Sequence, residues 1–359
     1  MKPLPVVLRP LTEETLHSWL SRVAAVYRMS LDQLLEPSLS HLHSLMLEVD
    51  SSTLQFLANL TRTTPDFLSR HTVSSWTTEE RLQWLTIWQT EPSWMFPHYE
   101  FRFQLTTNYC EACLLEDAAT TGVEFLRLHW LLAPQTICPR HLTFLRETCR
   151  CCNRQVQHRH WRSRTKFVLT CAWTRKPLAQ EPREHRDSPE PVRRCLASFE
   201  QSLLATIRGQ TSDGTWFGGQ SVPDILRVVC DLLWLLTRAV GNDSYIQHCL
   251  EGSHFRPHCR WERPPKAKPW VGDLRIHDRR SVLATLALLL DSGVDRKILH
   301  DPRRLLMPRI RTLDHLLALE DQQELRQKIG LWHSAFQSLA LNLLAGLQST
   351  DCCQKRSTH

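Results

Sequence analysis

The feature that most constrains this chain is a cluster of cysteines in its middle part. Seven of the 13 cysteines lie within 62 residues: Cys110, Cys113, Cys138, Cys149, Cys151, Cys152 and Cys171. In a reducing compartment such a cluster indicates metal binding rather than disulfide bonds. We expect that compartment because the first 20 residues already carry Arg9, Glu13 and Glu14 and do not resemble a signal peptide.

The first four candidate ligands form two knuckles. Cys110 and Cys113 make a Cys-x-x-Cys pair, and after 24 intervening residues Cys138 and His141 make a Cys-x-x-His pair. Each short turn places two ligands on one side of a loop, as a tetrahedral Zn²⁺ site requires. Four protein ligands leave no position open for water, so the sequence predicts one structural zinc ion. Its binding free energy would stabilise a segment that has little core of its own.

A second set of cysteines is incomplete as a zinc site. Cys149 pairs with Cys152 as Cys-x-x-Cys, or with Cys151 as Cys-x-Cys, and Cys171 follows Cys152 after 18 intervening residues. Thr174 stands where a fourth cysteine would complete the pattern. A second zinc ion therefore needs a ligand from elsewhere.

The second set of cysteines has two possible interpretations. His158 or His160 could replace the missing cysteine as the fourth ligand. Alternatively, the segment is a degenerate finger without metal, held together by the aromatic residues Trp161, Phe167 and Trp173.

The composition favours a globular and mostly helical protein. Of the 359 residues 42% are hydrophobic and 23% are charged, which excludes collagen-like, mucin-like and wholly disordered chains. Only 11 residues are glycine, and long alternating runs of valine and isoleucine are rare, so helices are favoured over a large sheet. The most apolar stretch, residues 225–240, contains three charged residues and is too short to span a bilayer. We therefore expect a cytoplasmic protein without a membrane segment.

Helical periodicity is clearest near the N-terminus. Apolar residues recur at helical spacing over residues 16–24, with Thr12 as the expected N-cap. A short helix is expected to start at Ser30, which can form a capping box with Gln33. Residues 53–60 and the segment that starts at Thr64-Pro65 predict two helices separated by about three residues. This spacing is typical of a helix-turn-helix, although many core helix pairs share it.

Changes in composition divide the chain into five expected parts. They are an N-terminal helical unit with the helix-turn-helix (1–107), a small zinc-finger or zinc-ribbon module (108–176), a polar linker (177–194), a C-terminal helical domain (195–348) and a frayed tail (349–359). The fold class that follows is mostly α.

Charge is spread unevenly along the chain. Residues 1–100 have a net charge of −4, whereas residues 150–194 have +8 and residues 256–280 have +5. An acidic part that meets protein and basic parts that meet nucleic acid would explain this division. The arginines expected to contact nucleic acid or a partner are Arg150, Arg154, Arg159, Arg162 and Arg164. The alternative is that these arginines form an ordinary solvated face.

The sequence contains no pattern that favours an enzyme. It has no His-Glu-x-x-His motif and no phosphate-binding loop of the Gly-x-x-x-x-Gly-Lys-Ser/Thr type. His98-Tyr99-Glu100 matches half of the nucleotide-deaminase pattern, but Tyr109 rather than proline precedes Cys110. We therefore expect no catalytic residues.

The order of these features resembles the TniQ family of bacterial transposition proteins. The opening RPLTEETLHSWLSRVA is similar to the start of that family, and YCEACLLEDA followed by LRLHWLLAPQTICPRHLTFLRETCRCC is similar to its double-finger signature. The resemblance covers residues 6–176. It implies that Cys110, Cys113, Cys138 and His141 form the first zinc site. It also implies that Cys149, Cys152 and Cys171 form part of a second site, from which Thr174 departs.

The resemblance implies a targeting subunit rather than a recombinase. Such proteins connect a target-site recogniser to the AAA+ ATPase of the transposon, which recruits the transposase. One branch binds as a homodimer to an RNA-guided type I CRISPR complex (Cascade) carrying guide RNA and target DNA. A second branch reads an attachment site in DNA directly, and a third directs insertion near resolution sites. We expect the first role. The alternative is a DNA-binding selector that places the helix pair at 53–71, or an equivalent pair in the C-terminal half, in the major groove.

Overall fold

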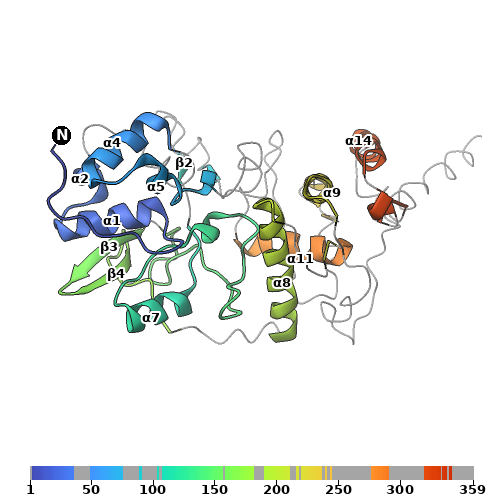
Figure 1. Cartoon of the computed structure of the whole chain (residues 1–359). Helices are drawn as coiled ribbons and strands as arrows, with labels where there is room; N and C mark the ends of the chain where they lie inside the picture. The colour runs from blue at the N-terminus through green and yellow to red at the C-terminus, as the bar shows by residue number, and fades with distance from the viewer. Residues whose placement is uncertain are drawn as a thin grey trace, which may run out of the picture. The chain divides into compact units, whose positions relative to one another are not determined.

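The computed structural model divides the chain into two compact units, Met1–Glu184 and His185–His359 (Figure 1). Each unit is described by itself. The structure describes residues 2–35, 49–75, 89–90, 103–104, 107–156, 158–181, 190–210, 216–217, 220–236, 239–240, 243–244, 276–290, 319–332, 334–337 and 339–341. The aromatic-rich segment around residues 77–105, the basic segment 256–270 and the tail 349–359 lie largely or wholly outside these residues.

Helix α1 (Leu16–Val26) forms the centre of the first unit. Its expected N-cap was wrong: the side chain of Thr15, not Thr12, accepts a hydrogen bond from the backbone N–H of Ser18 at 3.1 Å. The chain turns before the helix because Glu13 adopts a positive φ of 62°, and the carboxylate of Glu14 accepts from the N–H of Leu11 at 2.9 Å. Glu13 and Glu14 therefore lie ahead of the helix.

Short helices pack around α1. Helix α2 (Leu31–Leu35) begins with the predicted capping box, in which the N–H of Ser30 and the side chain of Gln33 lie 2.9 Å apart. Helix α4 (Ser51–Thr61) and helix α5 (Pro65–Ser69) are separated by three residues, as expected. Their apolar sides join α1 in one core with Leu16, Trp19, Leu20, Val23, Leu57, Leu60 and Leu68.

A hairpin, a longer helix and several short elements complete the described part of the first unit. Strand β3 (His158–Ser163) pairs antiparallel with strand β4 (Lys166–Cys171), and α1 packs against β3. Helix α7 (Glu111–Thr120) packs against β4 (Figure 1). Two 3₁₀ turns, η1 (Val73–Ser75) and η3 (Leu128–Leu131), contact each other. Strand β1 (Gln89–Thr90) pairs with strand β2 (Phe103–Gln104).

Backbone hydrogen bonds join the helical segment to the cysteine-rich segment. The N–H of Thr15 donates to the carbonyl of Leu126 at 2.9 Å, and the N–H of Leu128 donates to the carbonyl of Glu13 at 2.9 Å. The N–H of Leu126 also donates to the hydroxyl of Ser18 at 3.1 Å. Residues expected in the segments 1–107 and 108–176 thus share one packed unit.

The described part of the second unit is helical. Helices α8 (Glu190–Ile207), α9 (Val222–Leu236) and α11 (Ile276–Leu290) pack against one another, and α14 (Leu319–Gly330) packs against α9. A 3₁₀ turn η7 (Ser334–Phe336) follows, and strands β5 (Ala239–Val240) and β6 (Asp243–Ser244) pair. Helix α8 starts within the segment 177–194 that was expected to be a linker. Among the described residues, none of the helices is both long and apolar enough to cross a membrane.

Candidate metal centres

The four ligands predicted from the first pair of knuckles converge in the structure. The ligand atoms of Cys110, Cys113, Cys138 and His141 all lie within 4.8 Å of one another. The Nδ1 atom of His141 lies 3.3 to 3.7 Å from the three sulfur atoms, and the sulfur atoms of Cys113 and Cys138 are 3.6 Å apart. A tetrahedron with bonds of about 2.3 Å to sulfur and about 2.0 Å to nitrogen has edges of about 3.5 to 3.8 Å. The distances from Nδ1 of His141 to the three sulfur atoms, and between the sulfur atoms of Cys113 and Cys138, therefore match the edges of a tetrahedral site.

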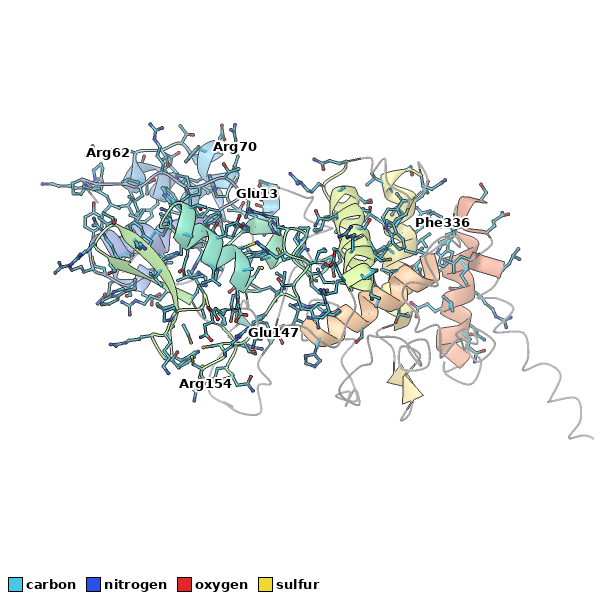
Figure 2. All side chains as sticks on the ribbon, turned by 90° about the horizontal axis from the view of Figure 1, so that it is seen from below. Glu13, Arg62, Arg70, Glu147, Arg154 and Phe336 are labelled. Carbon is cyan, nitrogen blue, oxygen red and sulfur yellow. The ribbon has the colours of Figure 1, made fainter. Side chains whose placement is uncertain are left out.

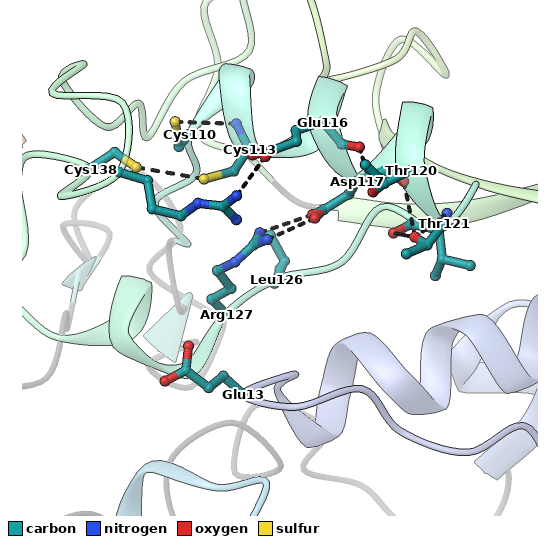
Figure 3. A network of polar contacts seen from close by, with 12 residues as sticks. Glu13, Cys110, Cys113, Glu116, Asp117, Thr120, Thr121, Leu126, Arg127 and Cys138 are labelled. Atoms are coloured by element: carbon teal, nitrogen blue, oxygen red, sulfur yellow. Dashed lines mark hydrogen bonds and ion pairs between the residues drawn. The ribbon is translucent and has the colours of Figure 1, made fainter.

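Local backbone structure places these ligands. Cys110 is the N-cap of α7, and its sulfur accepts from the N–H of Cys113 at 3.5 Å, so the first turn of the helix holds two ligands (Figure 3). The second knuckle is a tight turn in which the N–H of Leu142 donates to the carbonyl of Cys138 at 2.8 Å. Leu142 takes a positive φ of 49° to close that turn.

The thiols influence one another's protonation. Hydrogen bonds from Cys113 and Cys138 lower the pKa of Cys110 below its usual range. The same contacts with Cys110 raise the pKa of Cys113, and they raise the pKa of Cys138 to about 11. Hydrogen bonds among the three thiols therefore stabilise a thiolate within this cluster. Binding of a metal ion at this site would release the remaining thiol protons.

A carboxylate lies behind the histidine ligand. The Nε2 atom of His141 is 3.3 Å from Oε2 of Glu116, one turn along α7 from Cys113. Arg140 donates to the other oxygen of Glu116 at 2.5 Å. An imidazole that binds a metal through one nitrogen commonly donates its other N–H to a carboxylate, which fixes the tautomer and the ring orientation. The motif spacing did not single out Glu116, although its position three residues after Cys113 places both on one side of the helix.

The first knuckle is also connected to the second set of cysteines. Glu111, 7% exposed, forms an ion pair with Arg150, and its Oε1 lies 3.5 Å from Nε of Arg146. Burial raises the pKa of Glu111, and the two guanidinium groups oppose that shift. Arg150 also donates to the carbonyl of Glu181 at 2.9 Å. Arg150, one of the arginines expected at a binding surface, is thus held within the unit.

The three remaining cysteines also form a cluster. The sulfur atoms of Cys149, Cys152 and Cys171 lie within 4.8 Å of one another, and those of Cys152 and Cys171 are 3.9 Å apart. The hydroxyl of Thr174 lies 3.9 Å from the sulfur of Cys149. Thr174 therefore stands beside the cluster, at the position expected for the missing ligand.

Neither candidate histidine joins the second cluster. His160 is buried, and its Nε2 lies 2.9 Å from the carbonyl of Glu124. His158 places its Nε2 2.9 Å from Nδ1 of His17 on α1. Burial lowers the pKa of both His158 and His160. The alternative in which one of them completes the site is not the arrangement seen here, because the strand directs both side chains toward α1 and the adjoining segment.

The interpretation that three aromatic residues hold the finger together applies to only one of them. Phe167 is 7% exposed, as expected for a side chain that holds the finger together. Trp161 and Trp173 are 64% and 51% exposed, so they do not form its core. Four of the five singled-out arginines are exposed, and they flank these rings: Arg154, Arg159, Arg162 and Arg164.

A buried ion pair supports the segment after α7. Arg127 donates two hydrogen bonds to the carboxylate of Asp117, at 2.8 and 3.0 Å (Figure 3). The guanidinium carbon of Arg127 also lies 4.3 Å from the ring centre of Phe125 and 4.9 Å from that of Trp130. These contacts fix the chain between the two knuckles. The described residues thus contain two sets of side chains that could hold a metal ion.

A family model matches part of the chain. Residues 5–145, which include the first four-ligand cluster, match the family model TniQ. No curated protein matches the chain. Residues 5–145 are therefore similar to the TniQ domain, which supports a transposon-associated targeting protein in general.

Proposed function

We propose that this protein is a transposition targeting adaptor that connects an RNA-guided type I CRISPR complex (Cascade) to the AAA+ ATPase and transposase of its transposon. The observation that carries the proposal is the family match over residues 5–145 together with the closed ligand set that lies in it. A site with four protein ligands supports structure and leaves no position for a substrate. In this proposal the protein has no catalytic residues and acts by holding other molecules together.

The metal in this proposal is Zn²⁺. Three thiolates and one imidazole in a tetrahedral arrangement are a ligand set that zinc prefers. Cys110, Cys113, Cys138 and His141 would hold the first ion and stabilise the turn between α7 and the second knuckle. Cys149, Cys152 and Cys171 would hold a second ion with a weaker set, because threonine is not among the usual zinc ligands.

The nucleic-acid contacts of the adaptor are assigned to exposed arginines. Arg154, Arg159, Arg162 and Arg164 are exposed, whereas Arg150 is engaged with Glu111 and makes a smaller contribution. Arginine binds phosphate oxygens through paired N–H groups. We assign guide RNA or target DNA to this surface. From the resemblance to the TniQ family we also propose that the protein is a homodimer in the cytoplasm.

The second candidate is a selector that reads target DNA directly. The pair α4 and α5, with a connection of three residues, favours this reading. Arg62 and Arg70 flank the second helix and are exposed, but Asp66 lies between them (Figure 2). Because positive and negative charges nearly cancel on this helix pair, it attracts phosphates only weakly. This observation keeps the adaptor as the leading proposal.

Co-purification tests the two candidates against each other. The full chain is expressed with Cascade subunits and guide RNA, with and without the AAA+ ATPase, and each complex is isolated through a tag on Cascade. The adaptor is expected to elute with Cascade and to recruit the ATPase, while the protein alone binds duplexes weakly and without sequence preference. Selective binding of one duplex by the isolated protein at 150 mM salt, about the physiological concentration, with no association with Cascade, would favour the selector instead.

A further inference from the structure

Two tryptophans of the first unit are exposed on one continuous element. Trp161 lies in β3 and is 64% exposed, and Trp173 lies in the turn after β4 and is 51% exposed. By contrast, Trp19 and Trp130 of the same unit are fully buried. A tryptophan ring carries a large apolar surface, so two exposed rings on one hairpin and its adjoining turn indicate a surface that another molecule covers.

The backbone around these rings is firmly held. Trp161 lies opposite Val168 in an antiparallel register that is continuous from His158 to Ser163. Beyond the end of β4, the N–H of Arg175 donates to the carbonyl of Cys171 at 2.8 Å and closes the turn that carries Trp173. Two residues of β4 lie between Val168 and Cys171, and Trp173 follows two residues after Cys171. The two rings are therefore presented from one fixed hairpin and its adjoining turn.

The charge around the rings has one sign. Residues 149–176 contain eight Lys and Arg residues and no Asp or Glu. Besides the four exposed arginines named above, Lys166, Arg175 and Lys176 are exposed. A stretch with only cations at its surface attracts a polyanion.

One cation is already placed against an exposed ring. The guanidinium carbon of Arg154 lies 5.1 Å from the ring centre of Trp173. Arg154 extends outward at the periphery of the unit (Figure 2). This pairing puts a phosphate-binding group next to an aromatic platform, the combination that single-stranded nucleic acid uses for backbone and base contacts.

We propose that this surface, formed by Trp161, Trp173 and the exposed cations of residues 154–176 and called here the hairpin surface, binds unpaired nucleotides. The cations bind phosphates, and the two indole rings stack on bases that are not in a duplex. A base inside a duplex is stacked on its neighbours and does not offer a free face to a flat ring. The proposal deepens the proposed function by assigning the kind of nucleic acid that the adaptor touches, and it rests on that function only for the biological source of the strand.

Binding to short oligonucleotides tests the hairpin surface. The full chain is titrated into labelled strands of about 12 nucleotides, as DNA, as RNA and as a DNA duplex, and fluorescence anisotropy is recorded at several salt concentrations. We expect a single strand to bind more tightly than the duplex. Replacing both rings (Trp161→Ala with Trp173→Ala) should weaken single-strand binding about 10- to 100-fold, because each stacked base contributes about a factor of ten. The RNA and DNA arms tell which strand is preferred.

Matched variants separate stacking from charge and from folding. Replacing both rings by phenylalanine should retain most of the affinity, and Phe67→Ala, which removes an exposed aromatic ring on α5, should leave it unchanged. Arg159→Gln with Arg164→Gln should reduce the salt dependence while the preference for single strands stays. Thermal unfolding and metal content of every variant should equal those of the wild type, since the changed side chains are exposed.

Three outcomes would overturn the proposal. They are equal binding by the Trp-to-Ala double variant and the wild type, equal binding of single strand and duplex, and displacement of the strand by poly-glutamate with the same dependence on both rings. The last outcome would assign the surface to an acidic protein partner. Absence of single-strand binding by the wild-type protein, together with intact co-purification with Cascade, would refute the hairpin surface and leave the adaptor standing. Single-strand binding that depends on both rings, without co-purification with Cascade, would refute the adaptor and leave the hairpin surface standing.

Discussion

Oε2 of Glu116 lies 3.3 Å from Nε2 of His141, on the side of the imidazole that faces away from the three thiols. The other ring nitrogen, Nδ1, is the atom that approaches the sulfur atoms. A carboxylate in this place favours the tautomer with its proton on Nε2 and so leaves Nδ1 free to bind a metal. Helix α7 therefore supplies both a ligand, Cys113, and the group that orients another ligand.

Glu116→Gln should weaken metal binding without unfolding the protein. The amide has no charge to hold the imidazole proton, and loss of such a partner typically lowers affinity about 10- to 100-fold. Competition with a chromophoric zinc chelator measures the change. Arg140→Ala is the matched control, because it removes the contact between Arg140 and Glu116 but leaves Glu116 beside His141. Equal loss in both variants would mean that the ion pair, and not the carboxylate, is what matters.

Removal of the metal should unfold the first unit around α7. The buried thiols of Cys110, Cys113 and Cys138 would then lose the ion that joins the two knuckles. We expect EDTA, or Cys138→Ser, to lower the melting temperature by about 10 °C or more, since structural zinc contributes folding free energy directly. Calorimetry with and without chelator gives the measurement. Cys230→Ser in α9, outside either thiol cluster, is the control, and chelator should act on it as on the wild type.

The local part of the metal site could be predicted from the sequence. The two knuckles are short, so their spacing alone brings together two ligands each, and the structure joins the two pairs as expected. The role of Glu116 depends on how α7 meets the turn after Cys138, which is a tertiary relationship that spacing does not contain. The position of Thr174 beside the second cluster could also be predicted, because Thr174 follows Cys171 at the spacing of a knuckle.

The tryptophans show where composition was misleading. Aromatic residues near cysteines suggested a finger core, but successive residues of a strand point to opposite faces. His160 is buried, so its neighbour Trp161 must face away from that packing. The segment HRHWRS has no apolar alternation, and only the packing of α1 against β3 decides which face is covered.

Thr174→Cys should complete the second site. The hydroxyl of Thr174 lies 3.9 Å from the sulfur of Cys149, so a sulfur at this position stands next to the three existing thiols. A fourth thiolate should raise the zinc affinity of this site on the order of tenfold or more. Titration with Co²⁺, followed by the absorption bands of tetrahedral thiolate coordination, measures the change. Ala172→Cys adds a thiol to the same turn at an exposed position. An equal effect of this variant would contradict the assignment of position 174 as the fourth ligand position.

Glu14→Gln should strongly destabilise the first unit. Its carboxylate is fully buried and accepts from Nε of Arg22 at 2.7 Å, and Arg22 is 3% exposed. Removing one partner leaves a buried charge without compensation, which costs about 3–5 kcal/mol. The neighbouring exposed change Glu13→Gln, whose carboxylate lies 3.7 Å from His129, should cost about 0–1 kcal/mol. Urea unfolding compares the two variants, and a similar midpoint for both would contradict a buried pair.

Glu124→Gln should stabilise the protein at alkaline pH and not at acid pH. Burial raises the pKa of Glu124 to about 7 from its ordinary 4.5, although its carboxylate accepts from the N–H of Leu169 at 2.7 Å. Between these two values the folded protein holds a proton that the unfolded chain has released. The stability contributed by Glu124 is therefore complete below about pH 4.5 and is lost as the pH rises through 7.

The glutamine variant carries no charge at any pH, so its difference from the wild type isolates this group. We expect the variant to be more stable by about 1–3 kcal/mol at pH 8 and equally stable near pH 4, since each pKa shift of one corresponds to about 1.4 kcal/mol. The neighbouring His160 acts in the opposite direction: burial lowers its pKa to about 3, so its contribution is lost as the pH falls below 6.5. That term is common to both proteins and cancels in the comparison. Unfolding in urea at pH 5, 6, 7 and 8, with the metal sites saturated, gives the curve, and a difference that does not grow with pH would show that Glu124 is ionised in the folded protein throughout this range.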